Sequence, residues 1–143
     1  MKKIFTLVAL AALLYSCVAG SDKSQENEVK DIQGEWAIEE AMGKSTAGGD
    51  KEAVITFAAD STFAGNATVN SFFGDYRYVA EGDSLILDHV GMTRMMGGSM
   101  EIEAEVEKAI NALVTVELAD SVAVLFDKDK NQVMKLQIGR AHV

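Results

Sequence analysis

The chain of 143 residues contains no proline, one cysteine, one tryptophan and two histidines. The absence of proline is typical of a β-sheet protein, because proline removes a hydrogen-bond donor that a strand ladder needs. A single cysteine excludes an intramolecular disulfide and any zinc or iron–sulfur site built from several cysteines. Basic residues are also few: 13 Lys and Arg stand against 22 Asp and Glu, which gives a formal net charge of −9. This charge repels phosphate backbones, so we expect no nucleic-acid partner.

A long hydrophobic run is absent as well. The apolar run from Ile4 to Leu14 is shorter than the roughly 20 residues that cross a bilayer, and two lysines precede it. A basic start, a short apolar run and a small residue before the cleavage point are the parts of an export signal. Leu14-Tyr15-Ser16-Cys17 also resembles a bacterial lipobox, which implies cleavage before Cys17 and acylation of Cys17, for example with palmitate. The alternative is an ordinary signal peptide with a chance cysteine.

We therefore expect three parts: a lipoprotein signal peptide (1–16), an acylated Cys17 followed by a flexible tether (17–30), and one globular domain (31–143). The lipid would make the membrane a partner and place the chain in the bacterial cell envelope. Val18 after the cysteine, by resemblance to enterobacterial sorting, indicates the outer membrane. The sequence leaves open whether the domain faces the periplasm or the cell surface.

Short segments of alternating polarity, separated by turn residues, fill the domain and predict about eight antiparallel strands. In the first strand we expect Trp36, Ile38 and Met42 to face the core, and we expect residues 43–51 to form a loop. The further strands are expected at 54–58, 62–67, 73–79, 85–90, 114–118, 122–126 and 132–138. Apolar residues at helical spacing predict one helix at 100–113, with Ser99 as its N-cap. Eight strands are enough to close into a barrel, and the helix would cover one end.

The order of these segments, together with residues at their joints, resembles the META-domain family, which includes the HslJ-type heat-shock lipoproteins. The similarity runs from about Ile32 to Gln137, and the residues that carry it are Gly34-Glu35-Trp36, Phe63, Gly65, Asn70, Phe73-Gly74, Tyr76 and Thr93-Arg94-Met95. Thr68-Val69 and Gly97 stand where relatives carry two cysteines, so a thiol role cannot operate here. The resemblance implies a mainly β fold. The implied fold is a small antiparallel eight-stranded barrel of lipocalin-like architecture, with one helix before the last three strands.

Asn70, Tyr76, Thr93 and Arg94 are the polar residues that the resemblance supports best. We expect them to be structural: Asn70 and Thr93 tie loops to the backbone, and Arg94 pairs with an acid at the barrel mouth. A ligand pocket at that mouth is the alternative. His89 is expected on a strand face, and no Gly-x-Ser-x-Gly motif frames a nucleophile. We predict no catalytic residue, no metal site and no cofactor.

Two clusters need separate interpretations. The glutamates at 101, 103, 105 and 107 are expected to form a solvated helix face. Met92, Met95, Met96 and Met100 lie among three glycines, and we expect them to fill a gap beneath the helix because thioethers adapt to irregular spaces. The alternative is a Cu(I) site, with His89 as a further ligand.

The sequence thus indicates a non-enzymatic bacterial envelope lipoprotein with a role in stress tolerance, such as heat shock, or in envelope maintenance. Two alternatives stay open. One is a barrel that binds or inhibits a protein partner through its loops. The other is copper handling by the segment that carries Met92, Met95, Met96 and Met100, which we call the methionine segment.

Overall fold

The computed structural model describes residues 31–138. The expected signal peptide, Cys17 and the tether lie outside the described residues. The described elements, in chain order, are β1 (Gly34–Ala41), β2 (Lys44–Ser45), β3 (Val54–Phe57), β4 (Thr62–Asn66), β5 (Ser71–Val79), β6 (Ser84–Met92), α2 (Met100–Ala112), β7 (Thr115–Ala119), β8 (Val122–Phe126) and β9 (Gln132–Ile138).

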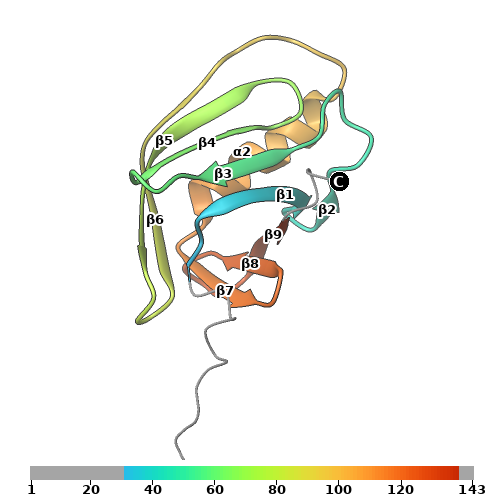
Figure 1. Ribbon diagram of the computed structural model, residues 1–143. Helices are drawn as coiled ribbons and strands as arrows, with labels where there is room; N and C mark the ends of the chain where they lie inside the picture. The colour runs from blue at the N-terminus through green and yellow to red at the C-terminus, as the bar shows by residue number, and fades with distance from the viewer. Residues whose placement is uncertain (1–30, 139–143) are drawn as a thin grey trace, which may run out of the picture. The chain divides into compact units, whose positions relative to one another are not determined.

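Eight of these strands close into an antiparallel barrel. Each strand from β3 to β9 pairs with the next along the chain, β1 pairs with β3, and β1 also pairs with β9 to complete the ring (Figure 1). The predicted mainly β fold, an eight-stranded barrel with one helix before the last three strands, is confirmed. Closure satisfies the backbone groups that an open sheet would leave unpaired at its edges.

The short strand β2 was not expected. Lys44 and Ser45 pair with Ala41 and Glu40 at the end of β1, inside the segment predicted as a loop. The next residue, Thr46, donates its hydroxyl hydrogen bond to the carbonyl oxygen of Ile38. Two polar residues carry no alternation of polarity, so the sequence gives no signal for such a strand.

Large side chains fill the barrel. Trp36, Phe57, Phe63 and Phe72 are fully or almost fully buried, and aliphatic side chains of β6, β8 and β9 lie in the same core. The rings of Phe57 and Phe63 lie 6.2 Å apart, as do those of Phe63 and Phe72. Trp36 also donates its indole N–H to the carbonyl oxygen of Ile32 at 2.8 Å. The interior of the barrel is therefore a packed apolar core.

A β-bulge in β1 corrects one core prediction. Against β9, Ile38 pairs with Leu136 and Glu40 with Lys135, so one extra residue stands on β1 at this point. An extra residue reverses which side of the strand each following side chain takes. Ala41 is consequently buried, and Met42, expected in the core, is 37% exposed.

Helix α2 packs on β1, β9 and β2 and lies behind β1 and β3 in Figure 1. Val106, Ala109 and Ile110 form its buried stripe, as the spacing predicts. Ser99 occupies the N-cap position, but its side chain makes no capping hydrogen bond. The Ser99 hydroxyl instead accepts the backbone N–H of Asp50 at 2.9 Å, so it ties the helix start to the loop before β3. Within residues 31–138, no helix has the length and apolar character needed to cross a membrane.

Candidate functional site

The start of α2 and the β4–β5 connection share a buried polar network. The Glu103 carboxylate, in the first turn of α2, accepts the backbone N–H groups of Val69 at 2.9 Å and Asn70 at 2.7 Å. It also accepts the side-chain amide of Asn70. Glu103 is only 2% exposed, so the expected solvated acidic face is wrong at this residue. Hydrogen bonds to a carboxylate and the positive end of the helix dipole stabilise a buried negative charge.

Asn70 connects this carboxylate to the segment that follows β6. Its side-chain oxygen accepts the backbone N–H of Met95 at 2.5 Å, and its side-chain nitrogen donates to the carbonyl oxygen of Met95 at 3.0 Å. Thr93 donates its hydroxyl to the same Asn70 oxygen at 2.8 Å and accepts the backbone N–H of Ser71 at 3.0 Å. Asn70 and Thr93 therefore tie loops through the contacts that their residue types favour.

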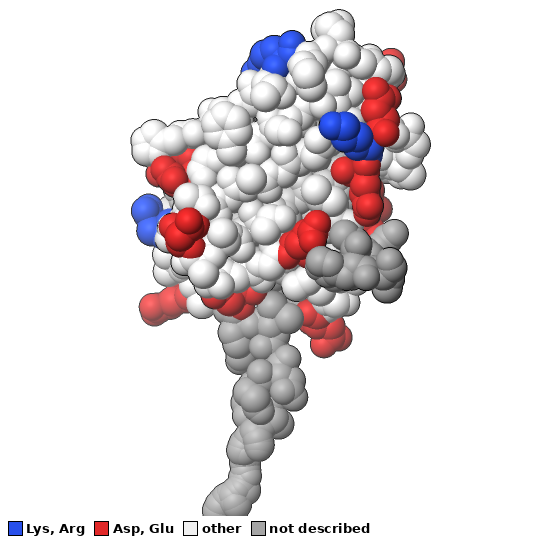
Figure 2. Space-filling view, turned by 45° about the horizontal axis from the view of Figure 1, so that its top comes forward, with Lys and Arg blue, Asp and Glu red and all other residues white. Residues whose placement is uncertain are grey.

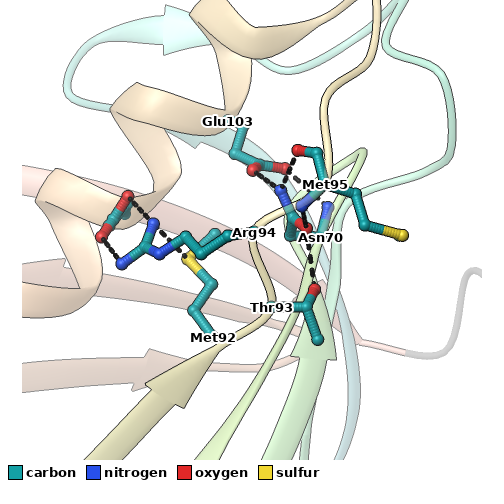
Figure 3. A network of polar contacts seen from close by, with 7 residues as sticks. Asn70, Met92, Thr93, Arg94, Met95 and Glu103 are labelled. Carbon is teal, nitrogen blue, oxygen red and sulfur yellow. Dashed lines mark hydrogen bonds and ion pairs between the residues drawn. The ribbon is translucent and has the colours of Figure 1, made fainter.

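Arg94 lies beside this network and pairs with helix α2 (Figure 3). Its guanidinium donates to both carboxylate oxygens of Glu107, at 3.2 and 3.1 Å. This two-pronged hydrogen bond raises the pKa of Arg94 above its ordinary value. Both side chains are partly or largely solvent-exposed, so the pair contributes little to stability.

Tyr76 and His89 lie elsewhere. The Tyr76 hydroxyl donates to the carbonyl oxygen of Ala58 at 2.8 Å, and burial raises the pKa of this phenol. His89 lies on β6, and its Nδ1 is 2.9 Å from Oδ2 of Asp75 on the neighbouring strand β5. The structure therefore brings Asn70, Thr93 and Arg94 together and leaves Tyr76 outside the cluster.

The sequence interpretation missed Glu103, although the spacing contained a signal for it. Glu103 stands three and seven residues before Val106 and Ile110, so it occupies the same buried stripe of the helix. A glutamate at that place needs hydrogen-bond donors, and the tight connection between β4 and β5 supplies two backbone N–H groups.

The methionine segment departs from its expected role. Met95 is 57% exposed and Met96 is 84% exposed, so neither fills a gap beneath the helix. Met92 alone of these side chains packs partly against the core. Figure 3 shows the Met95 side chain pointing away from Asn70 while its backbone bonds to that residue. Met95, Met96 and Met100 line a shallow depression of about 140 Å³.

An uncharged face crosses β3, β4, β5 and β6. Thr56, Ala64, Phe73 and Gly91 form a row of neighbouring partners across four strands. Phe73 is 50% exposed, and a side chain at Gly91 would meet its ring, so the ring leans over the glycine. Figure 2 shows a broad face of the domain with no charged residue at its centre, bordered by acidic side chains and a few basic ones. Within residues 31–138, no three His, Cys, Asp or Glu side chains are grouped to hold a metal ion.

Comparison with known proteins gives one family and one fold. A family model described as META domain matches residues 28–138. No curated protein matches the chain. Among solved structures, the chain is similar to a DUF4847 family protein from Bacteroides vulgatus, with 15% identity over 76% of this chain and 94% of that one, at a TM-score of 0.57.

Two NMR structures are similar as well. For the first, the sequence identity is 20%, the match covers 82% of this chain and 96% of that chain, and the TM-score is 0.59. The second is a protein from Burkholderia xenovorans. Its sequence identity is 17%, the match covers 76% of this chain and 83% of that chain, and the TM-score is 0.56. Because these sequence identities are low, the similarity of the three structures to this chain shows a shared fold and nothing more.

Proposed function

Because this chain belongs to the META domain family, we propose that it is a non-enzymatic lipoprotein of the bacterial cell envelope that supports stress tolerance or envelope maintenance. Within the family, the HslJ-type heat-shock lipoproteins are the group that this role resembles.

The observation that carries the proposal is that the polar cluster is saturated by contacts within the chain. The buried Glu103 carboxylate has three N–H donors from the β4–β5 connection. The Asn70 side chain bonds in both directions to the Met95 backbone. A catalytic acid or base must instead be free to exchange a proton with a substrate. Together with the packed barrel interior, this arrangement favours a rigid domain that acts through its outer surface.

The anchoring part of the proposal rests on Cys17 and the residues before it. Several acyl chains on one cysteine bind a membrane stably, because each buried methylene contributes about 0.8 kcal/mol. Residues 17–30 would then separate the lipid from the barrel. Val18 supports sorting to the outer membrane.

A test of anchoring compares the full chain with its Cys17→Ala variant in a Gram-negative host supplied with labelled palmitate. We expect label and outer-membrane fractionation for the unchanged chain, and loss of both in the variant. A mature protein that begins at another residue and carries no lipid would contradict this part.

A test of the role uses cells of the source bacterium that lack the chain. After heat or envelope-damaging treatment, we expect the unchanged chain to restore survival and the Cys17→Ala variant to fail. Phe73→Ala, which alters the surface, separates a surface role from anchoring alone. Equal survival with and without the chain under every treatment would contradict a stress role.

A second candidate function is loop-mediated binding or inhibition of a protein partner. The exposed Met95 and Met96, in the connection between β6 and α2, favour it, because methionine and aromatic residues are enriched at interfaces. The half-exposed Phe73 of strand β5 adds an aromatic side chain on an uncharged face. Capture from envelope extracts should recover a partner with the unchanged chain and not with Phe73→Asp. Recovery of the same proteins by both would contradict binding through this face.

A further inference from the structure

Four of the seven methionines of the chain lie between residues 92 and 100. Met95 and Met96 expose most of their side chains, so burial does not account for their presence. Exposed apolar side chains gathered in one place commonly mark a binding site. Packing in the core therefore does not explain these two methionines.

Three methionines are among the residues that line one depression. Met95 and Met96 belong to the segment after β6, and Met100 is the first residue of α2. Its other lining residues are Asn70, Arg94, Glu103, Ala104 and Glu107. Methionine has three rotatable bonds and a polarizable sulfur, so its sulfur atom can be directed to a common point at low cost.

The segment that carries these methionines is fixed at both ends. Asn70 holds the Met95 backbone through two hydrogen bonds, and Asp50 accepts the backbone N–H of Gly98 at 3.1 Å. A side chain at Gly97 would come within 2.8 Å of Asp50 and Val69, so glycine is needed where the segment passes close to them. The backbone is thus held in place while the thioethers stay free to adjust.

Glu103, Glu107 and Arg94 also line the depression, but each is already hydrogen-bonded within the chain. The thioethers therefore set the class of ligand. Thioether sulfur is a soft ligand that selects Cu(I), whereas zinc, calcium and magnesium prefer nitrogen, thiolate or oxygen.

We propose that this depression binds one Cu(I) ion through the thioethers of Met95, Met96 and Met100. The inference is independent of the proposed anchoring and stress role, since it rests on side chains of the barrel domain alone. His89 is not among the residues that line the depression, so it is not a ligand in this proposal. Binding changes no oxidation state and requires no further reactant.

The test is a Cu(I) titration of the full chain in detergent against a chromogenic Cu(I) chelator. All proteins carry Cys17→Ala, so that a free thiol cannot compete. We expect one Cu(I) per chain, and a fall of about tenfold or more in the association constant when Met95, Met96 and Met100 are all replaced by Leu. Ag(I), which is not oxidised in air, should show the same difference, and Zn(II) should show none.

Met42→Leu is the matched control, because Met42 is a partly exposed methionine in the β1–β2 turn, outside the depression. Its Cu(I) binding should equal that of the unchanged protein. Circular dichroism and Trp36 fluorescence of the triple variant should match the unchanged protein, which excludes misfolding as the cause. Absence of Cu(I) retention against the chelator, or equal retention by the triple variant, would overturn the proposal.

Discussion

Asn70 and Glu103 are buried against each other although 33 residues separate them in sequence. Glu103 accepts both the backbone and side-chain N–H groups of Asn70, and Asn70 in turn holds the Met95 backbone. One carboxylate at the start of α2 therefore fixes the β4–β5 connection, which fixes the segment that leads into the helix. Polar networks of this kind stabilise a fold when every group has a partner and weaken it when one is removed.

Replacing Glu103 should show how much this network contributes to the free energy of unfolding. Glu103→Ala leaves the N–H groups of Val69 and Asn70 buried without an acceptor, so we expect a loss of about 1.5–3 kcal/mol in the free energy of unfolding. Urea denaturation measures it. Glu101→Ala, at an exposed position of the same helix turn, is the control and should change stability little. Equal losses in the two variants would show that the network contributes nothing specific.

Asn70→Ala should loosen the methionine segment more than the barrel. The Met95 amide then loses its acceptor, and hydrogen exchange at this amide should become faster than in the unchanged protein. Amides of the β8–β9 ladder should exchange at the same rates in the variant as in the unchanged protein, once the difference in their free energies of unfolding is taken into account. Asn111→Ala, at an exposed position of α2, serves as control. Unchanged exchange at Met95 would mean that other contacts hold this segment.

Trp36 is the single tryptophan, and it is fully buried in the core, as the sequence predicts. Native fluorescence should show an emission maximum typical of a buried indole. Trp36→Ala should lower the free energy of unfolding by about 3–5 kcal/mol, because it leaves a large cavity. Trp36→Phe should cost less, since it keeps most of the apolar volume and loses the hydrogen bond to Ile32. An emission maximum of a fully exposed indole would contradict the packing.

Gly65 in β4 has no room for a side chain. A Cβ atom there would collide with the carbonyl oxygen of Val54 and come within 2.5 Å of the Phe72 ring. We expect Gly65→Ala to lower the free energy of unfolding by about 1–3 kcal/mol through overpacking. Gly98→Ala is the comparison, because its nearest neighbour is the end of the Asp50 side chain at 3.2 Å. A neutral Gly65→Ala variant in thermal denaturation would contradict the close packing of β3, β4 and β5.

Glu105 gives a prediction about pH. A hydrogen bond from Lys44 at 3.2 Å, supported by the charge of Lys108, lowers the pKa of Glu105 below its ordinary value. A carboxylate with a lowered pKa stabilises the folded state above its unfolded pKa, and this contribution is lost as pH falls through the folded pKa. In Lys44→Met, NMR titration should show the pKa of Glu105 rising toward the ordinary value. Lys51→Met should leave the pKa of Glu105 unchanged, and the same rise in both variants would contradict the assignment to Lys44.

The elements of the fold could largely be predicted because their signals are local. Alternation of polar and apolar residues gave β8 at 122–126 and β9 at 132–138 with the bounds that the structure has. The helical spacing of Val106, Ala109 and Ile110 gave α2 and its buried stripe. In each case a repeat of two or about 3.6 residues identifies the face that packs, whatever the partner is.

The parts of the candidate site were harder to predict because they depend on contacts between distant segments. Asn70, Thr93 and Arg94 could be named from the sequence. The spacing places Glu103 on the same helix stripe as Val106 and Ile110, but which groups its carboxylate meets depends on how α2 packs on the barrel. The pairing of Arg94 with Glu107 depends on the same packing. The lipobox at Cys17 lies outside the described residues, so its interpretation stays a prediction.

The sequence by itself determined the acidic charge, and it indicated the positions of eight strands, the helix and most of the apolar core, because hydrophobic burial follows from residue type and short-range spacing. Only the tertiary structure decided where the extra residue of β1 turns Met42 outward, where Glu103 finds its donors, and which methionines are left in solvent. Each of these depends on register or on a contact across many residues. A one-residue shift in a strand exchanges inside for outside, and local patterns do not record such a shift.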